Sequence, residues 1–370
     1  MIYVHVPFCR SFCTYCDFYS EIASRECGGI LGSWLDSMLK EIESRKDEIS
    51  APTEVDTLYI GGGTPSVLPL SFPGRIVSAI KELRPKGFSE FTVEVNPDDI
   101  SPSYASGLRE LGVDRVSMGV QSFDDGILRW MNRRHDSAGA VKAFRTLREA
   151  GFGNISIDLI FGLPQLTDGI WSDTVSKALA LGPEHVSAYQ LSVEGGSALA
   201  EMRGRGEWEE APEDICRRQY DYLCRKLSDA GYRHYEISNF ALPGREAVHN
   251  SAYWRRVPYV GLGPGAHSMI RSAGEERRVW NTETLSGWIQ EGEVLSPEDI
   301  RTERIMLGLR TAEGMEVSEL ESLAGKETVL QLERDGALVK DFGGGDPADG
   351  RIRIPEDRFF VSDEIIRELL

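Results

Sequence analysis

The chain has 370 residues, of which 41% are hydrophobic and 27% charged, and its formal net charge at pH 7 is -18. This composition is typical of a folded globular protein, and we find no apolar run long enough to cross a bilayer. The negative charge argues against a nucleic-acid surface, which needs clustered basic residues. Because the chain opens on a strand pattern with no basic leader or cleavage site, we expect a cytoplasmic protein.

Short apolar runs, each followed by a stretch with helical periodicity, alternate along the first half of the chain. Strands are expected at Ile2–Val6, Val55–Ile60, Phe91–Val95, Arg115–Val120, Ile155–Ile160 and His185–Leu191. Helices are expected at Gly32–Glu48, Pro73–Leu83, Pro102–Leu111, Ala138–Ala150 and Ile170–Ala180. Such alternation predicts an α/β fold with a parallel sheet. Since six units fall short of the eight in a closed barrel, we predict an open, partial (β/α)6 barrel over residues 1–195.

Beyond residue 195 the alternation ends. A helical stretch at Pro212–Ala230 leads to Tyr232–Phe240 and to a glycine-rich aromatic segment at His249–His267, all within a connecting region over residues 196–295. Further helices are expected at Arg301–Leu309, Val317–Leu323 and Thr328–Asp335, followed by a hairpin from Leu338 to Phe360 with its turn at Gly343–Asp346. This order predicts a small winged-helix-like α+β domain over residues 296–370.

Polar or glycine residues follow five of the predicted strands. They are Gly61 to Thr64, Glu94 with Asn96, Gly119 with Gln121, Asp158, and Tyr189 with Ser192. The C-terminal ends of barrel strands share one mouth, where active sites lie. Turns are often polar for other reasons, but five such positions in register favour a site at the mouth.

Three of the six cysteines, Cys9, Cys13 and Cys16, lie within eight residues of one another. Iron–sulfur clusters are normally bound by four thiolates, so three would leave one iron open to an amine and carboxylate of another ligand. The alternative is a structural zinc site, which usually takes four ligands; only His5 is close in sequence. We expect the remaining cysteines to be ordinary thiols: Cys27, Cys216 and Cys224.

The CxxxCxxC loop after the first strand resembles the radical S-adenosylmethionine (SAM) superfamily. The segment Tyr3–Cys9 is similar to the branch that contains the oxygen-independent coproporphyrinogen III dehydrogenases and the HemW heme chaperones. Further similar segments are Gly61–Pro65, Glu94–Pro97, Met118–Phe123, Ile157–Pro164 and Glu303–Arg310. The resemblance implies a [4Fe-4S] cluster on Cys9, Cys13 and Cys16, with the fourth iron open to SAM.

The same resemblance implies the residues that bind SAM. Tyr3 would lie beside the cluster and SAM, and Gly62, Gly63 and Thr64 would line the methionine amino group. Glu94, Gln121, Arg133 and Asp158 would contact the rest of SAM, with the Arg133 guanidinium suited to the carboxylate. Each residue taken alone also fits a plainer role, such as a glycine turn, a solvated carboxylate or a surface arginine.

Two classes of function follow from this branch: a carrier that delivers heme to apo-hemoproteins, and an enzyme that oxidatively decarboxylates coproporphyrinogen III. Three features favour the carrier. Asp17 and Phe18 follow Cys16, where the enzymes typically have Gly-Cys. The enzymes carry an extension ahead of the first strand, whereas this sequence opens on that strand. The segment His249–Trp254 matches the HNxxYW pattern associated with heme binding in HemW proteins.

A neutral imidazole is a common axial ligand of heme iron, and aromatic side chains pack on porphyrin faces. We therefore predict that His249 binds heme, with His267 as a second candidate and Arg255 and Arg256 paired with the propionates. The alternative is that His249 is a hydrogen-bonded core histidine. The resemblance implies respiratory, membrane-bound heme acceptors as partners, and the sequence leaves open whether the chain forms a homodimer.

Overall fold

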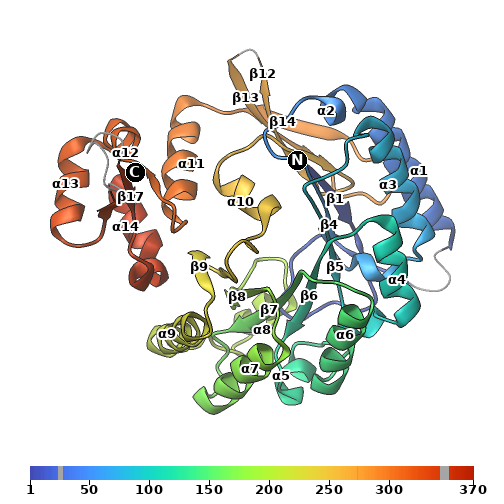
Figure 1. The fold of residues 1–370 in the computed structure, drawn as a ribbon, viewed down its shortest axis with the longest axis horizontal. Helices are drawn as coiled ribbons and strands as arrows, with labels where there is room; N and C mark the ends of the chain where they lie inside the picture. Colours follow the sequence, from blue (N-terminus) through green and yellow to red (C-terminus); the bar gives the residue numbers. More distant parts are fainter. Residues whose placement is uncertain (24–27, 273, 342–349) are drawn as a thin grey trace.

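The structure is a computed structural model that describes residues 1–23, 28–272, 274–341 and 350–370. Cys27 and the turn predicted at Gly343–Asp346 lie outside the described residues. Figure 1 shows a curved central sheet with helices along its outer face and a smaller C-terminal part, in orange and red, beside it. None of the helices in the described ranges is both long and apolar enough to span a membrane.

The central sheet has nine strands in the order β11-β1-β4-β5-β6-β7-β8-β10-β9. Six consecutive members of this sheet are parallel: β1 (Ile2–Val6), β4 (Thr57–Gly62), β5 (Glu90–Val95), β6 (Arg115–Gln121), β7 (Ile155–Phe161) and β8 (His185–Gln190). The helices of these units are α1 (Gly28–Ser44), α2 (Lys46–Ser50), α3 (Ser71–Leu83), α4 (Pro102–Leu111), α5 (Asp125–Trp130), α6 (Ser137–Glu149) and α7 (Asp168–Leu181). The predicted partial (β/α)6 barrel is confirmed, with strand bounds within two residues of those expected.

The alternation of residues along the strands decides what faces the inside of the barrel. In β6, Val116, Met118 and Val120 belong to the hydrophobic core shared with the helices. The alternate residues, Arg115 and Ser117 among them, line a cavity on the inner face. Parallel strands covered on both faces are usually apolar throughout, so a polar inner face marks this lumen as a binding cavity.

The chain beyond residue 195 adds three strands to the same sheet. β11 (Val260–Leu262) pairs in parallel with β1, and β10 (Asn239–Ala241) and β9 (Arg233–Glu236) extend the sheet antiparallel to β8. Two helices precede them, α8 (Ala198–Gly204) and α9 (Glu213–Asp229). The division of the chain at residues 195 and 295 stays a proposal, and the sheet draws strands from both sides of the first boundary.

Helix α10 (Val248–Trp254) closes the N-terminal end of the barrel. The Glu90 carboxylate, at the start of β5, accepts the backbone N–H groups of Val248 and His249 at 2.9 and 3.0 Å. The Thr57 hydroxyl, at the start of β4, bonds His249 Nδ1 at 2.8 Å. These contacts fix α10 across the lumen, opposite the mouth formed by the strands' C-terminal ends.

In the described residues, two three-stranded sheets lie outside the central sheet. β12 (His267–Ser272), β13 (Glu275–Asn281) and β14 (Gln290–Val294) form an antiparallel meander that the sequence did not indicate. The C-terminal part contains α11 (Pro297–Leu309), β15 (Met315–Glu316), α12 (Val317–Ala324), α13 (Lys326–Arg334), β16 (Val339–Asp341), β17 (Arg351–Arg353) and α14 (Ser362–Leu369). Three helices followed by an antiparallel pair is the order expected of a winged-helix-like domain.

Candidate functional site

The three clustered cysteines line one cavity of about 960 Å³ that runs from the mouth of the barrel into its lumen. Most of the predicted cofactor residues line the same cavity: Cys9, Cys13, Cys16, Gly62, Gly63, Thr64, Glu94, Gln121, Arg133 and Asp158. Two predicted residues, Tyr3 and His249, are not among those that line it. The structure therefore brings residues from five strands, the cysteine loop, the turn after β4 and the segment after α5 to a single polar cavity.

A short parallel strand pair shapes the cysteine loop. β2 (Phe8–Cys9) pairs with β3 (Glu21–Ile22), so both ends of the loop are held together. The loop is joined to the glycine turn after β4, because Thr64 N–H donates to the Phe8 carbonyl at 2.7 Å and Gly63 N–H donates to the Val6 carbonyl at 2.9 Å. The loop and the turn therefore form one wall of the cavity.

All three cysteines of the loop are free thiols and half-buried. Cys13 Sγ accepts a hydrogen bond from Arg133 Nη1 at 3.4 Å, and Cys9 Sγ lies 3.4 Å from the Thr64 hydroxyl. Burial raises the pKa of Cys9, and raises that of Cys16 to about 11. A raised pKa favours the neutral thiol, whereas the thiolate is the form that binds metal. A positive charge beside the sulfurs would stabilise the thiolates, and the iron of an iron–sulfur cluster would supply it.

In the part of the chain that the structure describes, no three His, Cys, Asp or Glu side chains gather closely enough to hold a single metal ion. The three loop thiols instead share a cavity large enough for a cluster and a small molecule. Together with the Arg133 guanidinium beside Cys13, this donor set fits a [4Fe-4S] cluster with an open iron.

Glycine is required in the turn after β4 because a side chain would collide with the cysteine loop. Gly62 has a φ of 105°, and a Cβ there would lie 2.5 Å from the His5 ring. A Cβ on Gly63 would lie 2.8 Å from the Phe8 carbonyl oxygen and 2.9 Å from that of Val6. Since these oxygens belong to backbone, the wall can only accept a side chain by moving the loop.

We therefore expect Gly63→Ala to lower the free energy of unfolding by about 1–3 kcal/mol and to reduce the iron and sulfide bound per chain. Gly153→Ala is the matched control, because nothing lies within 4 Å of a Cβ at that exposed glycine. Chemical denaturation and iron analysis check both variants. Equal stability and iron content in the two would contradict the close packing of the wall.

Two carboxylates inside the lumen have raised pKa values because they are buried. Glu94 accepts the Tyr59 hydroxyl at 2.7 Å and the Gly62 N–H at 3.1 Å, and burial raises its pKa to about 7. Asp158 accepts hydrogen bonds from the Ser117 and Ser156 hydroxyls, and burial likewise raises its pKa. Glu94 can therefore hold a proton near neutral pH, while the oxygens of both carboxyl groups stay oriented by fixed donors.

Unusual backbone conformations place the remaining predicted SAM residues. Gln121 ends β6 with a φ of 68°, next to an irregularity in its pairing with β7, and Asn132 has a φ of 56°. Arg133 follows, and its Nη2 donates to the Gly119 carbonyl. Positive φ in non-glycine residues is concentrated at functional sites, and both of these residues line the cavity.

Tyr3 lies deeper than predicted. Its hydroxyl bonds His5 Nδ1 at 3.0 Å, and its ring lies 6.1 Å from that of Tyr59. His5 in turn bonds the Tyr19 carbonyl at 3.0 Å. Tyr3 thus supports the cysteine loop through His5. Tyr59, Arg115 and Asn250 also line the cavity and were not predicted from the sequence. Polar positions that alternate with the apolar core positions of the strands are the signal that could have found the first two.

His249 is buried, and both of its ring nitrogens are hydrogen-bonded. Nδ1 bonds the Thr57 hydroxyl at 2.8 Å and Nε2 bonds the Tyr253 hydroxyl at 3.1 Å. Burial lowers the pKa of His249 to about 3, so the imidazole is neutral. The other heme candidate, His267, is exposed on β12 and stacks on Trp280 at 6.1 Å.

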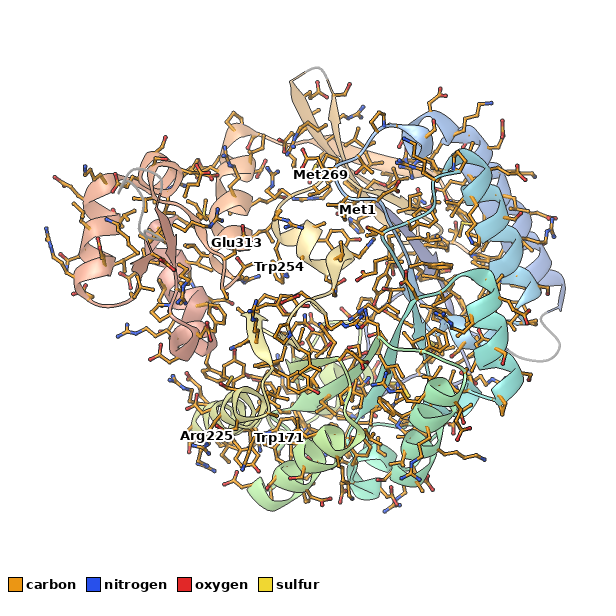
Figure 2. The ribbon with its side chains drawn as sticks, in the orientation of Figure 1. Met1, Trp171, Arg225, Trp254, Met269 and Glu313 are labelled. Carbon is orange, nitrogen blue, oxygen red and sulfur yellow. The ribbon has the colours of Figure 1, made fainter. Side chains whose placement is uncertain are left out.

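A second cavity, of about 1500 Å³, lies between α9, α10, α11 and the C-terminal domain. Helix α10 faces both cavities, because Asn250 lines the barrel cavity whereas Trp254 lines the second. Arg225, Trp254 and Glu313 line the second cavity, and Figure 2 shows Trp254 and Glu313 near one another. His249 lies on the helix between the two.

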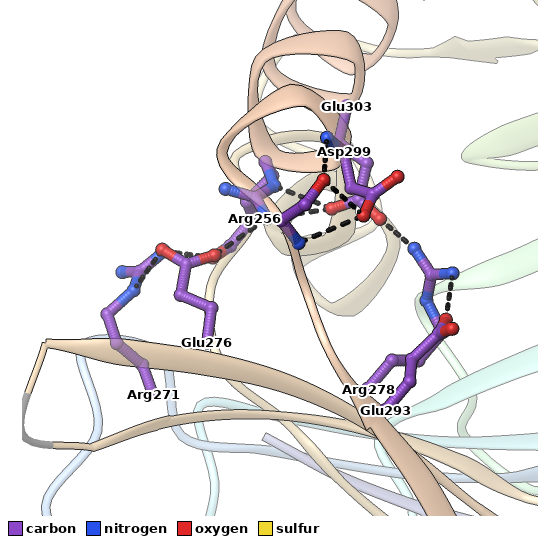
Figure 3. Close-up of polar contacts among 8 residues, drawn as sticks. Arg256, Arg271, Glu276, Arg278, Glu293, Asp299 and Glu303 are labelled. Carbon is purple, nitrogen blue, oxygen red and sulfur yellow. Dashed lines mark hydrogen bonds and ion pairs between the residues drawn. The ribbon is translucent and has the colours of Figure 1, made fainter.

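Of the two arginines that were expected to meet heme propionates, Arg255 is exposed and lines the second cavity. Arg256 is buried, and its guanidinium is already paired with Glu276 and Glu303, both at 2.7 Å (Figure 3). These ion pairs join the segment just after α10 to β13 and α11. Arg256 therefore serves the packing of these elements, which removes the reason to assign it to a propionate.

Known proteins that are similar to this chain belong to the class that the cysteine loop and its cavity indicate. A family model described as the radical SAM superfamily matches residues 3–178. A protein from Synechocystis sp. named heme chaperone HemW is 33% identical over 92% of this chain and 84% of its own length. A protein of the same name from Mycobacterium tuberculosis is 33% identical over 100% of this chain and 94% of its own. One from Lactococcus lactis is 35% identical over 86% of this chain and 84% of its own.

Among solved structures, coproporphyrinogen III oxidase (HemN) from Escherichia coli, described as a radical SAM enzyme, superposes with a TM-score of 0.79. The superposition covers 100% of this chain and 89% of that one at 22% sequence identity, which shows a shared fold. A cysteine loop at the mouth of a partial barrel is the arrangement that defines the radical SAM class, which implies SAM and a [4Fe-4S] cluster as cofactors. The chain belongs to the radical SAM superfamily and, within it, to the HemW family.

Proposed function

We propose that this protein is a heme chaperone: it binds heme and a SAM-ligated [4Fe-4S] cluster and transfers heme to apo-hemoproteins, respiratory enzymes among them. The observation that carries the proposal is the position of the HNxxYW helix. It closes the barrel that contains the cysteine loop, faces a second large cavity, and holds a neutral imidazole between the two. The names of the relatives from three bacteria support the same function.

Within this proposal Cys9, Cys13 and Cys16 hold the cluster, which supplies one electron to a bound sulfonium when it is reduced. Gly62, Gly63 and Thr64 form the wall along which SAM binds. The other proposed SAM residues stand around the same cavity or support it: Tyr3, Glu94, Gln121, Arg133 and Asp158. Donors already present, such as Tyr59 on Glu94, keep these groups oriented before SAM arrives.

The experiment that tests the function uses protein purified without oxygen, with its cluster rebuilt. We expect heme to bind saturably, with a sharpened Soret band, and to pass to apomyoglobin on mixing. Coproporphyrinogen III supplied with SAM and a reductant should stay unchanged. Formation of protoporphyrinogen would instead support the porphyrinogen enzyme, and absence of any saturable heme binding would overturn the carrier.

The role of His249 can be tested through Tyr253, whose hydroxyl occupies Nε2. If His249 ligates heme iron through Nε2, Tyr253→Phe frees that nitrogen, and we expect tighter heme binding than in the unmodified protein. His249→Ala should weaken binding by about tenfold or more, which corresponds to about 1.4 kcal/mol. Heme titrations followed at the Soret band measure both. An unchanged affinity in both variants would remove His249 from the heme site.

A further inference from the structure

Arg115 is the first residue of β6, and its side chain points into the lumen of the barrel. The side chain is buried, with the residue only 1% exposed. Its Nε has no hydrogen-bond partner, and no carboxylate among the described residues forms an ion pair with the guanidinium. An unpaired guanidinium in a closed lumen is rare, because arginine stays charged and a buried charge is costly without a partner.

Burial raises the pKa of Glu94 and of Asp158, and both lie close enough to Arg115 for its charge to oppose that rise, but neither is hydrogen-bonded or ion-paired to it in the described part of the chain. Glu94 is bonded by Tyr59 and Gly62, and Asp158 by serine hydroxyls. His185 is neutral, since burial lowers its pKa far below the usual range. Its two ring nitrogens bond Ser156 and the Tyr235 hydroxyl at 2.8 and 2.7 Å. The N–H donors of Arg115 therefore remain available to a ligand in the cavity.

Arg115 lies deeper in the lumen than the residues at the mouth that are proposed to bind SAM, although Glu94 and Asp158 are near it. Arg115 and Gln121 are at opposite ends of β6, roughly 20 Å apart along the strand. Helix α10 crosses the same end of the lumen as Arg115, and its Asn250 lines the cavity there. The methionine carboxylate of SAM already has a proposed partner in Arg133 at the mouth. Arg115 is thus a second anion-binding group, at the floor of the lumen.

We infer that Arg115 binds a carboxylate of a second ligand, one that enters the barrel beneath the SAM site and reaches its floor. A guanidinium offers two parallel N–H donors that match the two oxygens of a carboxylate. The identity of this ligand rests on the proposed function. Heme carries two carboxylates, so it is the ligand that the inference assigns to Arg115. The floor of the lumen, rather than the cavity beside the C-terminal domain, then receives a porphyrin propionate.

The test uses the full-length protein with its cluster and two iron-free probes, deuteroporphyrin with its two carboxylates and the dimethyl ester of deuteroporphyrin. Fluorescence titrations compare the unmodified protein with Arg115→Met and Arg115→Lys. Arg225→Met is the control, because Arg225 is exposed and lines the other cavity. The unfolding temperature of each variant is measured without any probe.

We expect Arg115→Met to weaken binding of the dicarboxylate roughly tenfold to hundredfold and to leave the ester unaffected. Arg115→Lys should restore part of the affinity, and Arg225→Met should bind like the unmodified protein. Without probe, Arg115→Met should unfold at a higher temperature, because it removes an unpaired buried charge. A merely structural arginine would give a lower unfolding temperature.

Equal binding of the dicarboxylate by Arg115→Met and the unmodified protein would overturn the inference while the proposed function stands. A lower unfolding temperature in Arg115→Met would overturn it as well. If the unmodified protein binds neither heme nor deuteroporphyrin, the proposed function fails. The unfolding temperatures of Arg115→Met and the unmodified protein then decide whether Arg115 is an unpaired charge that can bind an anion.

Discussion

Cys13→Ser is expected to abolish the iron–sulfur cluster while leaving the fold intact. Cys13 stands in the middle of the loop, and Arg133 donates to its sulfur, so the substitution removes one of only three proposed protein ligands to the cluster. The bound iron should fall from about four atoms per chain to nearly none after anaerobic reconstitution. Iron and sulfide analysis with visible absorption spectra measures the loss, and far-ultraviolet circular dichroism checks the fold.

Cys216→Ser and Cys224→Ser are the matched controls. Both cysteines lie in α9, away from the loop; Cys216 is buried and Cys224 half-buried beside His234. Each control should keep its full iron content. A cluster that survives in Cys13→Ser, or one lost in either control, would contradict the assignment of the cluster to the loop.

Glu236→Gln is expected to stabilise the protein at alkaline pH and to have little effect in acid. Glu236 is fully buried in β9, and its Oε2 has no hydrogen-bond partner. Burial raises its pKa from 4.5 to about 7. The folded protein therefore favours the protonated carboxyl, which glutamine resembles in shape and in lack of charge.

The way in which Glu236 makes stability depend on pH follows from proton binding in the folded and unfolded states. Below the unfolded pKa of 4.5 both states are protonated, and Glu236 carries no penalty. As pH rises toward 7, the unfolded chain loses its proton while the folded protein retains it, so stability falls. Above pH 7 the full penalty applies, about 3 kcal/mol for a shift of this size. Glu236→Gln removes it.

Thermal unfolding at pH 5 and pH 8 measures this difference. The gain in unfolding temperature from Glu236→Gln should appear at pH 8 and largely vanish at pH 5. Glu364→Gln, at an exposed position in α14, should change little at either pH. A stabilisation that is the same at both pH values would show that Glu236 does not titrate in this range.

The sequence predicts the barrel well because each of its strands carries its own signal. Ile2–Val6 and Arg115–Val120 are short runs that contain β-branched residues, the first ending just before a proline and the second starting after Asp114, and their limits hold within one residue. The cysteine loop is equally local, since its three thiols lie within eight residues. Such features need no knowledge of the rest of the chain.

Other parts depend on contacts between distant residues, which a single sequence does not reveal. Helix α10 has only seven residues, and it is held by Glu90 and Thr57 from the other end of the chain. β14 is exposed along its whole length and so lacks an apolar pattern. The pairing of Arg256 with Glu276 and Glu303 likewise appears only in three dimensions.

The pairing of β11 with β1 has a consequence for how the protein is made. Ile2 pairs with Val260, so the outer edge of the first strand stays open until most of the chain has left the ribosome. The cysteine loop and its glycine wall are complete once residue 64 has emerged, whereas α10, which closes the floor, ends at Trp254. Domains tend to fold from the N-terminus during synthesis. Cluster assembly can therefore precede closure of the barrel, since α10, β11 and the lining residue Glu283 all emerge much later than the cysteine loop.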